Sequence, residues 1–199
     1  MTDALLQASA TPPTTSGPAL FFKLWLANPL QMGSIVPSST ALCSRIAALV
    51  QRAEDEVVLE TGAGTGVVSR ALLAAGVPAE RLVVVEIVPE MAAHLRDSLP
   101  GVTVLCGDAF EMPALLPRHM HGKVGTAICG IPLVLLPQEQ QRRYVQSIEA
   151  VAPGKGFLLY SYCVTSPLPY RALGLAARRR AWTPLNFPPA SVWQYMPAG

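Results

Sequence analysis

Charged residues are scarce in this chain of 199 residues. They make up 14% of it, well below the quarter or so that is usual in soluble domains, while apolar residues make up 51%. Yet no apolar run reaches the roughly 18 residues that a transmembrane helix needs. The composition therefore argues against a membrane-spanning protein, and the unusually apolar surface indicates that something covers part of it. The length predicts one domain with a sizeable core.

Paired-cysteine motifs and an N-terminal apolar stretch are missing too. Cys43, Cys106, Cys129 and Cys163 are scattered without C-x-x-C spacing, which argues against a zinc site and a disulfide framework. Three of them lie in apolar strand-like runs, so we expect buried, reduced thiols and no bound metal. The first three residues lack the basic start of a signal peptide, and no suitable apolar stretch follows. We therefore expect a cytoplasmic protein.

Glycine is concentrated in one informative stretch. An apolar run ends in Glu60, and Gly62, Gly64 and Gly66 follow at alternate positions before a helix-like segment. This order predicts a strand, a tight nucleotide-binding turn and a helix. The spacing departs from the dinucleotide fingerprint, and the acid before the loop would oppose a phosphate. It suits S-adenosylmethionine, whose tail carries an ammonium and a sulfonium, and the E-x-G-x-G-x-G order resembles motif I of the Rossmann-like (class I) methyltransferases.

Acidic residues also stand at the ends of the next two predicted strands. Strand 81–86 ends in Glu86, which either accepts hydrogen bonds from ribose hydroxyls or caps the following helix. Strand 102–106 is followed by Asp108, which can accept a hydrogen bond from an adenine amino group. Because open α/β sheets bind ligands at the carboxyl ends of their strands, Glu60 and these two acids should share one rim. Three acids there disfavour a phosphate-rich ligand.

The turn after the fourth predicted strand, 124–129, indicates which kind of amine is methylated. Methyltransferases that act on the exocyclic amine of adenine carry an Asn or Asp here, followed by Pro-Pro or Leu-Pro and an aromatic. This chain has Gly130 in place of the polar residue, then Pro132, and Leu133 in place of the aromatic. A base would find neither a hydrogen-bond acceptor nor a stacking platform, whereas an aliphatic amine needs neither.

The C-terminal third predicts further strands and a basic surface. Tyr160 and Tyr162 alternate along strand 156–163 and share one face, where the rings either hold a methylated cationic headgroup or pack in the core. The strands around Ala181 and Val192 would form the antiparallel end of a seven-stranded sheet. Beyond residue 140, seven Lys and Arg residues face one acid. The run Arg178, Arg179 and Arg180 either meets an anionic partner or forms a solvated face.

The N-terminal region divides into three predicted parts. Residues 1–17 are rich in Thr, Pro, Ser and Ala and predict a flexible arm, residues 18–52 form a helical extension, and residues 53–199 form the methyltransferase domain. The segment 19–29 predicts a short, mostly apolar helix that either lies flat in a membrane interface or latches onto the core. Ser38 either caps a helix from 39 to about 51 or faces the ligand.

Several motifs together resemble those of the small, soluble bacterial phospholipid N-methyltransferases, which convert phosphatidylethanolamine stepwise to phosphatidylcholine. The motifs are the aromatic segment with Asn28-Pro29, Gly33-Ser34, Pro37-Ser38-Ser39, the glycine loop, Gly107-Asp108, Gly130-Ile131-Pro132-Leu133, Tyr160-Ser161-Tyr162, Asn186 with Pro188-Pro189-Ala190, and Trp193. Thr61 stands where many relatives have a small or apolar residue. The wider family includes ornithine-lipid methylating relatives, and the ribosomal RNA adenine dimethylases share its general layout, so both remain alternatives. A third is a non-catalytic membrane-binding module that has kept a nucleotide fold.

The resemblance implies a Rossmann-like α/β fold, with a seven-stranded, mostly parallel sheet, helices on both faces and an N-terminal amphipathic helical extension. It implies S-adenosylmethionine as cofactor, a phospholipid substrate, an anionic membrane surface on the inner face of the cell membrane, no nucleic acid, and a monomer. We assign the cofactor to Ser38, Glu60, Gly62, Ala63, Gly64, Gly66, Glu86, Ile87, Asp108, Ala109 and Gly130. We assign catalysis to Pro132, Tyr160 and Tyr162, and substrate or membrane contact to Phe21, Phe22, Lys23, Trp25, Arg178, Arg179 and Arg180.

Overall fold

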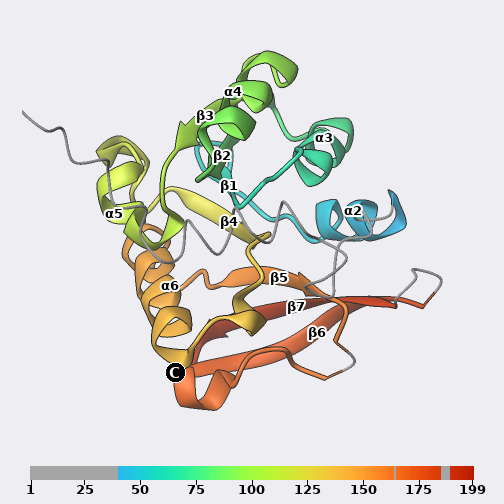
Figure 1. Cartoon of the computed structure of the whole chain (residues 1–199), viewed down its shortest axis with the longest axis vertical. Coiled ribbons are helices and arrows are strands. Elements are labelled where there is room, and N and C mark those ends of the chain that lie inside the picture. Colours follow the sequence, from blue (N-terminus) through green and yellow to red (C-terminus); the bar gives the residue numbers. More distant parts are fainter. Residues whose placement is uncertain (1–39, 164, 185–188) are drawn as a thin grey trace, which may run out of the picture.

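Short runs of β-branched and other apolar residues form one twisted sheet in the computed structural model, which describes residues 40–163, 165–184 and 189–199 (Figure 1). The strands are β1 (Val57–Thr61), β2 (Leu82–Glu86), β3 (Thr103–Cys106), β4 (Val124–Cys129), β5 (Phe157–Ser161), β6 (Leu175–Thr183) and β7 (Ala190–Pro197). Their order is β3-β2-β1-β4-β5-β7-β6, and every neighbouring pair is parallel except the two that include β7. The prediction of a seven-stranded, mostly parallel sheet is confirmed.

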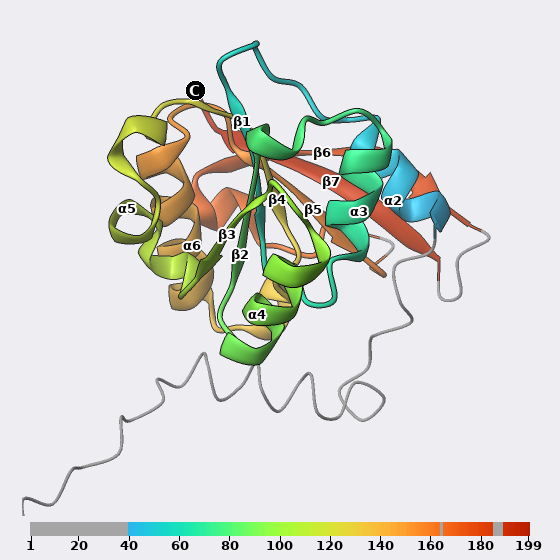
Figure 2. The same ribbon diagram turned by 90° about the horizontal axis from the view of Figure 1, so that it is seen from above.

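Helices cover both faces of the sheet, because every residue of β1 and β2 is buried and both faces need apolar partners (Figure 2). The helices are α2 (Thr40–Ala47), α3 (Val67–Ala74), α4 (Pro89–Ser98), α5 (Met112–Leu115) and α6 (Gln138–Val151). The helices α2, α3 and α4 pack on one face, and α5 and α6 pack on the other. Short 3-10 turns connect the described elements: η1 (Ala79–Arg81), η2 (Ala109–Glu111), η3 (Arg118–Met120), η4 (Leu133–Leu135) and η5 (Tyr170–Leu173).

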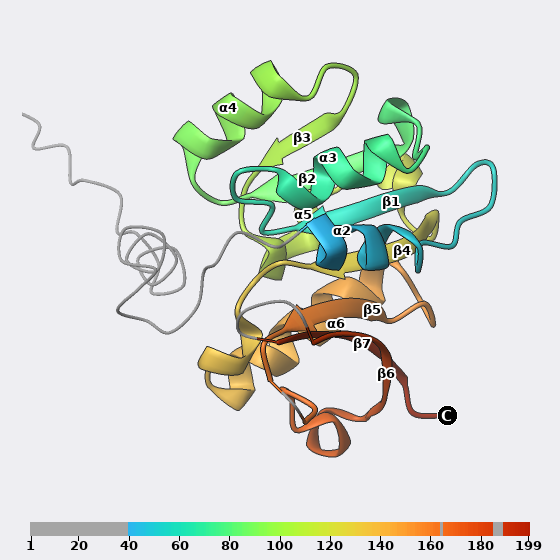
Figure 3. The ribbon, with the colours of Figure 1, turned by 90° about the vertical axis from the view of Figure 1, so that its right-hand side faces the viewer.

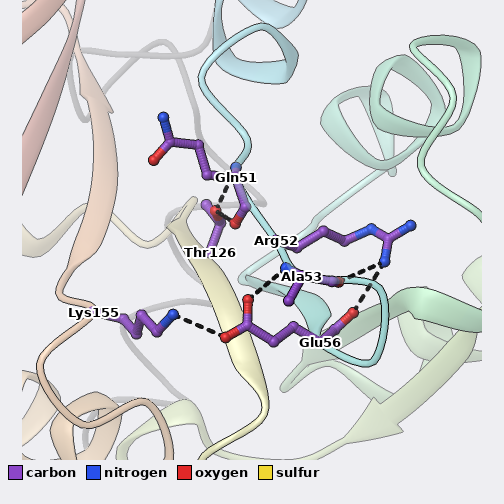
Figure 4. A network of polar contacts seen from close by, with 6 residues as sticks. All are labelled: Gln51, Arg52, Ala53, Glu56, Thr126 and Lys155. Carbon is purple, nitrogen blue, oxygen red and sulfur yellow. Dashed lines mark hydrogen bonds and ion pairs between the residues drawn. The ribbon is translucent and has the colours of Figure 1, made fainter.

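The helix expected to end near Gln51 ends at Ala47 instead. The chain turns there because it has to reach β4 before it enters β1. The Gln51 N–H donates to Thr126 Oγ1 at 2.9 Å, and the Thr126 hydroxyl donates to the Gln51 carbonyl at 2.6 Å (Figure 4). Leu42 and Ile46 of α2 are completely buried, so the described end of the N-terminal extension packs on the sheet itself.

A polar network fixes the entry to β1 at the amino edge of the sheet. The Ala53 N–H donates to Glu56 Oε2 at 2.7 Å, and Lys155 Nζ donates to Glu56 Oε1 at 2.8 Å (Figure 4). The hydrogen bond from Lys155 is the main reason why the pKa of Glu56 is lowered. Arg52 Nη1 donates to the Ala53 and Glu56 carbonyls at 3.0 and 3.4 Å. These contacts hold β1 in position at the edge opposite the glycine loop.

The strand boundaries correct two expectations about the C-terminal third and the cysteines. The strand expected to run to residue 163 ends at Ser161, so Tyr162 and Cys163 lie just beyond it. All four cysteines are free, but Cys106 is exposed and Cys163 is half-buried, so the expectation of buried thiols is wrong for both. Cys106 is exposed because β3 is an edge strand and this residue is its last.

Among the described residues, no helix is long and apolar enough to cross a membrane, and no cluster of three or more His, Cys, Asp or Glu residues could hold a metal ion.

Candidate active site

Two turns of the chain meet so closely at the carboxyl edge that only glycine fits in either. Gly62 follows β1 with a φ of 69°, and a Cβ there would lie 2.8 Å from Ile131 Cγ1. Gly130 follows β4, where a Cβ would lie 2.5 Å from the Gly62 carbonyl oxygen and 2.9 Å from the Tyr160 hydroxyl. The Gly130 N–H also donates to the Thr61 carbonyl at 2.8 Å. The glycine loop and the turn after β4 therefore form one unit, with Tyr160 against it.

Glu86 ties the glycine loop to the turn after β2. Its side chain is completely buried, Oε2 accepts the Gly64 N–H at 2.9 Å, and Oε1 accepts the Val88 N–H at 2.9 Å. Burial raises the pKa of Glu86, and these two backbone hydrogen bonds oppose the rise. The carboxylate therefore holds the turn that leads into α4 as well as the glycine loop. The ribose role assigned to Glu86 stays a prediction.

Glu60 lies beneath the loop with half of its carboxylate unsatisfied. It is 1% exposed, and Oε2 accepts the Ser69 hydroxyl at 2.6 Å. Oε1 has no hydrogen-bond partner in the part of the chain that the structure describes. Burial, and then the charge of Glu86, raise the pKa of Glu60 to about 7, while the bond from Ser69 opposes the rise. A buried carboxylate with a free oxygen is suited to a cationic partner, because an unpaired buried charge is costly.

An apolar hollow of about 430 Å³, counting its open mouth, lies beside the loop at the ends of β2, β3 and β4. It is lined by Gly62, Val85, Ile87, Gly107, Asp108, Ala109, Phe110, Ile131, Pro132 and Leu136. Five of the residues assigned from the sequence therefore come together here. Asp108 Oδ1 also accepts the Phe110 N–H at 3.0 Å, which caps the 3-10 turn η2 and fixes the carboxylate at the rim.

Tyr160 and Tyr162 pack against the same core cluster, the one beneath α2 and α3. Tyr160 belongs to β5, and its hydroxyl reaches the junction of Gly62 and Gly130. Burial, and then the charge of Glu60, raise the pKa of Tyr160 well above its usual value, so its phenol stays protonated at neutral pH. The hydroxyl is therefore a neutral hydrogen-bonding group at the site.

The sequence interpretation missed two polar residues that support the site. Ser69 holds Glu60, and its only sequence signal is its position in the first turn of the helix after the glycines. Tyr144 of α6 is completely buried, and its hydroxyl lies 2.8 Å from Thr61 Oγ1. Thr61, noted from the sequence as a departure from relatives, is thus the partner of a tyrosine 83 positions away in the chain. No local pattern could have paired these two residues.

Removing the Tyr144 hydroxyl should loosen both turns of the site together. We expect Tyr144→Phe and Thr61→Val each to lower the free energy of unfolding by about 1–2 kcal/mol, because each leaves a buried polar group short of a partner. The double variant should lose about 1 kcal/mol less than the sum of the two. Urea denaturation measures the stabilities, and the KM for S-adenosylmethionine should rise in all three variants. Strictly additive losses would show that the two hydroxyls do not act on each other.

Other residues assigned from the sequence lie apart from this site or outside the described residues. Arg178, Arg179 and Arg180 are exposed on β6, the edge strand at the opposite end of the sheet from β3 (Figure 3). Ala63 and Gly66 belong to the glycine loop, and Gly64 donates to Glu86 as described above. The remaining assigned residues lie outside the described ones: Phe21, Phe22, Lys23, Trp25 and Ser38, together with the arm 1–17.

Three features of this chain fit S-adenosylmethionine. Oε1 of Glu60, which has no hydrogen-bond partner in the described part of the chain, is buried and suited to a cation. The glycine junction lets a ligand approach the backbone at Gly62, and the apolar hollow with Asp108 at its rim suits a flat adenine ring and its amino group.

Comparison with known proteins supports the same conclusion. The sequence model of the family described as a methyltransferase domain matches residues 58–156. An ornithine lipid N-methyltransferase from Singulisphaera acidiphila is 25% identical over 140 residues, which cover 69% of this chain and 73% of that protein.

Two solved structures share the fold. A putative methyltransferase of Haloferax volcanii, solved with its activator, matches 88% of this chain and 97% of its own with a TM-score of 0.62 at 14% identity. An S-adenosylmethionine-dependent methyltransferase from Aquifex aeolicus matches 86% of this chain and 98% of its own with a TM-score of 0.58 at 14% identity. Fold, site and family match agree: this chain carries a class I methyltransferase domain and is an S-adenosylmethionine-dependent methyltransferase.

Proposed function

We propose that the protein methylates the headgroup amine of phosphatidylethanolamine and of its partly methylated derivatives, giving phosphatidylcholine. The observation that carries the proposal is the junction at Gly130. A Cβ there would lie 2.5 Å from the Gly62 carbonyl oxygen, so position 130 has no room for the Asn or Asp that a nucleobase amine requires. Leu133, at the position of the stacking aromatic, is completely buried in the core and offers no platform for a base. An acceptor on a flexible aliphatic headgroup fits this site better than a base.

Ornithine lipid is the second candidate acceptor, because the curated relative from Singulisphaera acidiphila is named for it. Both candidates present a primary amine on an aliphatic stem. The residues that line the hollow are mostly apolar, and Asp108, the one carboxylate among them, is assigned to the adenine. The lining therefore offers neither acceptor amine a carboxylate of its own and does not distinguish the two acceptors. The acceptor assay below separates them.

The residues at the junction would prepare the amine for transfer. Bound S-adenosylmethionine supplies an electrophilic methyl group on a cationic sulfur. The acceptor ammonium has no lone pair until it loses a proton, and an apolar site favours that loss because it disfavours the charged form. Tyr160, held protonated, can hydrogen-bond the amine, and the faces of Tyr160 and Tyr162 can receive the methylated cation. Positioning by Pro132 and the turn around it would supply the remaining catalysis.

We also propose where the enzyme works. A lipid acceptor requires access to a membrane, and we place the protein in the cytoplasm, as a monomer peripheral to the inner face of the cell membrane. The exposed Arg178, Arg179 and Arg180 on β6 would meet the anionic surface, at about 1 kcal/mol for each cation close to the lipids.

Incubation with labelled S-adenosylmethionine and one acceptor at a time tests the proposal. The acceptors are phosphatidylethanolamine in anionic vesicles, ornithine lipid in anionic vesicles, and ribosomal RNA mixed with anionic vesicles. We expect label in the phosphatidylethanolamine product, and a Tyr160→Leu variant should transfer at least tenfold less. Label only in ornithine lipid would show that the protein methylates a lipid amine but that the proposed acceptor is wrong. Label only in RNA would reject a lipid acceptor.

A further inference from the structure

Two apolar side chains are held out into solvent at the mouth of the site. Val134 and Leu135 are 41% and 44% exposed, in η4 directly after the turn that lines the hollow. Their neighbours Leu133 and Leu136 are buried, and the Gln141 side-chain amide donates to both neighbours' carbonyls at 3.0 Å. Gln141 is itself 5% exposed, so α6 clamps both ends of the turn. The exposure of this pair is therefore a fixed feature of the fold.

The third exposed large apolar residue of the described chain lies at the same edge of the sheet. Trp182 is 47% exposed and stands one residue before the end of β6. Since β7 is antiparallel to both β5 and β6, the strand β6 runs parallel to β5, and its carboxyl end lies at the edge that holds the site. The Arg179 guanidinium lies 5.7 Å from the centroid of the Trp182 ring. An arginine beside an exposed tryptophan is a pairing suited to a lipid headgroup region.

We infer that Val134, Leu135 and Trp182 form a membrane-docking surface that turns the mouth of the site toward an anionic bilayer. This inference rests on the proposed lipid acceptor and identifies which face of the protein meets the lipid. Single exposed apolar residues are common on protein surfaces, but these three all lie at the edge of the sheet that holds the site.

Charge complementarity selects a bilayer as the occupant of this surface. Arg178, Arg179 and Arg180 precede Trp182 on the exposed edge strand, and beyond residue 140 the sequence has seven Lys and Arg residues against one acid. Apolar side chains that enter the headgroup region beside cations gain from both burial and attraction to anionic lipids. With the exposed side chains of η4 and Trp182 in the headgroup region, the headgroup amine would reach the hollow without leaving the bilayer surface.

Quenching by brominated lipid tests the orientation. A full-length variant with Trp25→Phe and Trp193→Phe keeps Trp182 as its sole tryptophan. The control adds Trp182→Phe and Ala53→Trp, which moves the reporter to the exposed amino edge. With anionic vesicles that contain brominated phosphatidylcholine, we expect at least twofold stronger quenching at Trp182 than at position 53. A smaller difference overturns the inference, and so does a dimer in sedimentation velocity that Leu135→Ser dissociates.

Vesicle affinity tests the turn η4. The double variant Val134→Ser with Leu135→Ser should bind anionic vesicles roughly tenfold more weakly, since two apolar side chains no longer enter the bilayer. Leu49→Ser, which alters a partly exposed leucine at the amino edge, is the matched control, and S-adenosylmethionine affinity reports the folding of both. The docking surface is rejected if the double variant's loss of vesicle affinity is less than three times as large as the loss in Leu49→Ser.

The two hypotheses fail in different ways. If Trp182 is quenched and phosphatidylethanolamine receives no label, the proposed acceptor is wrong and the docking surface stands. If phosphatidylethanolamine is methylated and Trp182 is not quenched, the acceptor is right and this surface is not the one that meets the membrane.

Discussion

Replacing Glu60 with glutamine should weaken S-adenosylmethionine binding roughly a hundredfold at pH 8, or about 3 kcal/mol. The native carboxylate is 1% exposed and has one oxygen without a partner among the described residues, so its attraction for a bound cation is screened less than in water. Glutamine keeps the size of the side chain and removes the charge. Isothermal titration of the native and variant proteins measures the difference. Equal affinities at pH 8 would show that the charge of Glu60 does not act on the ligand.

The same residue should make cofactor binding depend on pH. Because the pKa of Glu60 is raised to about 7, its carboxyl group is largely protonated at pH 6 and ionised at pH 8. Affinity for the cationic ligand should therefore rise with pH through about 7 in the native protein and stay flat in Glu60→Gln. Ser69→Ala removes the hydrogen bond that opposes the rise, so its midpoint should move to higher pH. An unchanged midpoint in Ser69→Ala would contradict the role assigned to that hydroxyl.

The stability of the ligand-free protein should fall as pH rises, which is opposite to the change in cofactor affinity. The folded-state pKa of Glu60 is raised above the ordinary value of 4.5, so between about 4.5 and 7 the native protein holds a proton that the unfolded chain releases. The contribution of Glu60 to stability is therefore present at low pH and is lost as pH rises through this window. The full shift corresponds to roughly 3 kcal/mol. Glu60→Gln should abolish this pH dependence and be the more stable protein at pH 8, as thermal unfolding would measure.

Replacing Gly130 with alanine should lower activity at least a hundredfold and cost about 3 kcal/mol of stability. The added Cβ would lie 2.5 Å from the Gly62 carbonyl oxygen and 2.9 Å from the Tyr160 hydroxyl, and a backbone oxygen cannot move aside as a flexible side chain can. The two turns would separate, and the hollow, the glycine loop and Tyr160 would lose their common geometry. Methyl transfer and chemical denaturation measure the two losses.

Gly122→Ala is the matched control for this prediction. Gly122 has a φ of 73°, but a Cβ there would meet nothing within 4 Å, so only the cost of a left-handed alanine applies, about 1 kcal/mol. Its activity should equal that of the native protein. If Gly130→Ala keeps native activity, the junction is not a tight contact, and position 130 has room for a larger residue such as Asn or Asp.

The sheet could be predicted from the sequence because its signals are local. The buried strands β1, β2 and β4 are mostly apolar segments of five or six residues, and each ends in an acid or is followed by a glycine. Parallel strands place their carboxyl ends at one edge, so Asp108, Ile87 and Pro132 could be expected beside the glycine loop, and all three line one hollow. Local signals failed at the edges of the sheet: Cys106 is exposed, and within the described residues no strand pairs with the outer side of β3.

The sequence by itself determined the class of chemistry: E-x-G-x-G-x-G after an apolar run predicts a turn that accepts a cationic nucleotide ligand, because glycine spacing and a strand-end acid are local properties. Only the tertiary structure decided how that turn is built. It paired Thr61 with Tyr144, left one oxygen of Glu60 without a partner among the described residues, and brought Gly62, Gly130 and Tyr160 to one point. The physical reason is that the decisive contacts at Gly130 join residues 30 and 68 positions apart in the chain, and steric contact between such residues exists only once the strands are side by side.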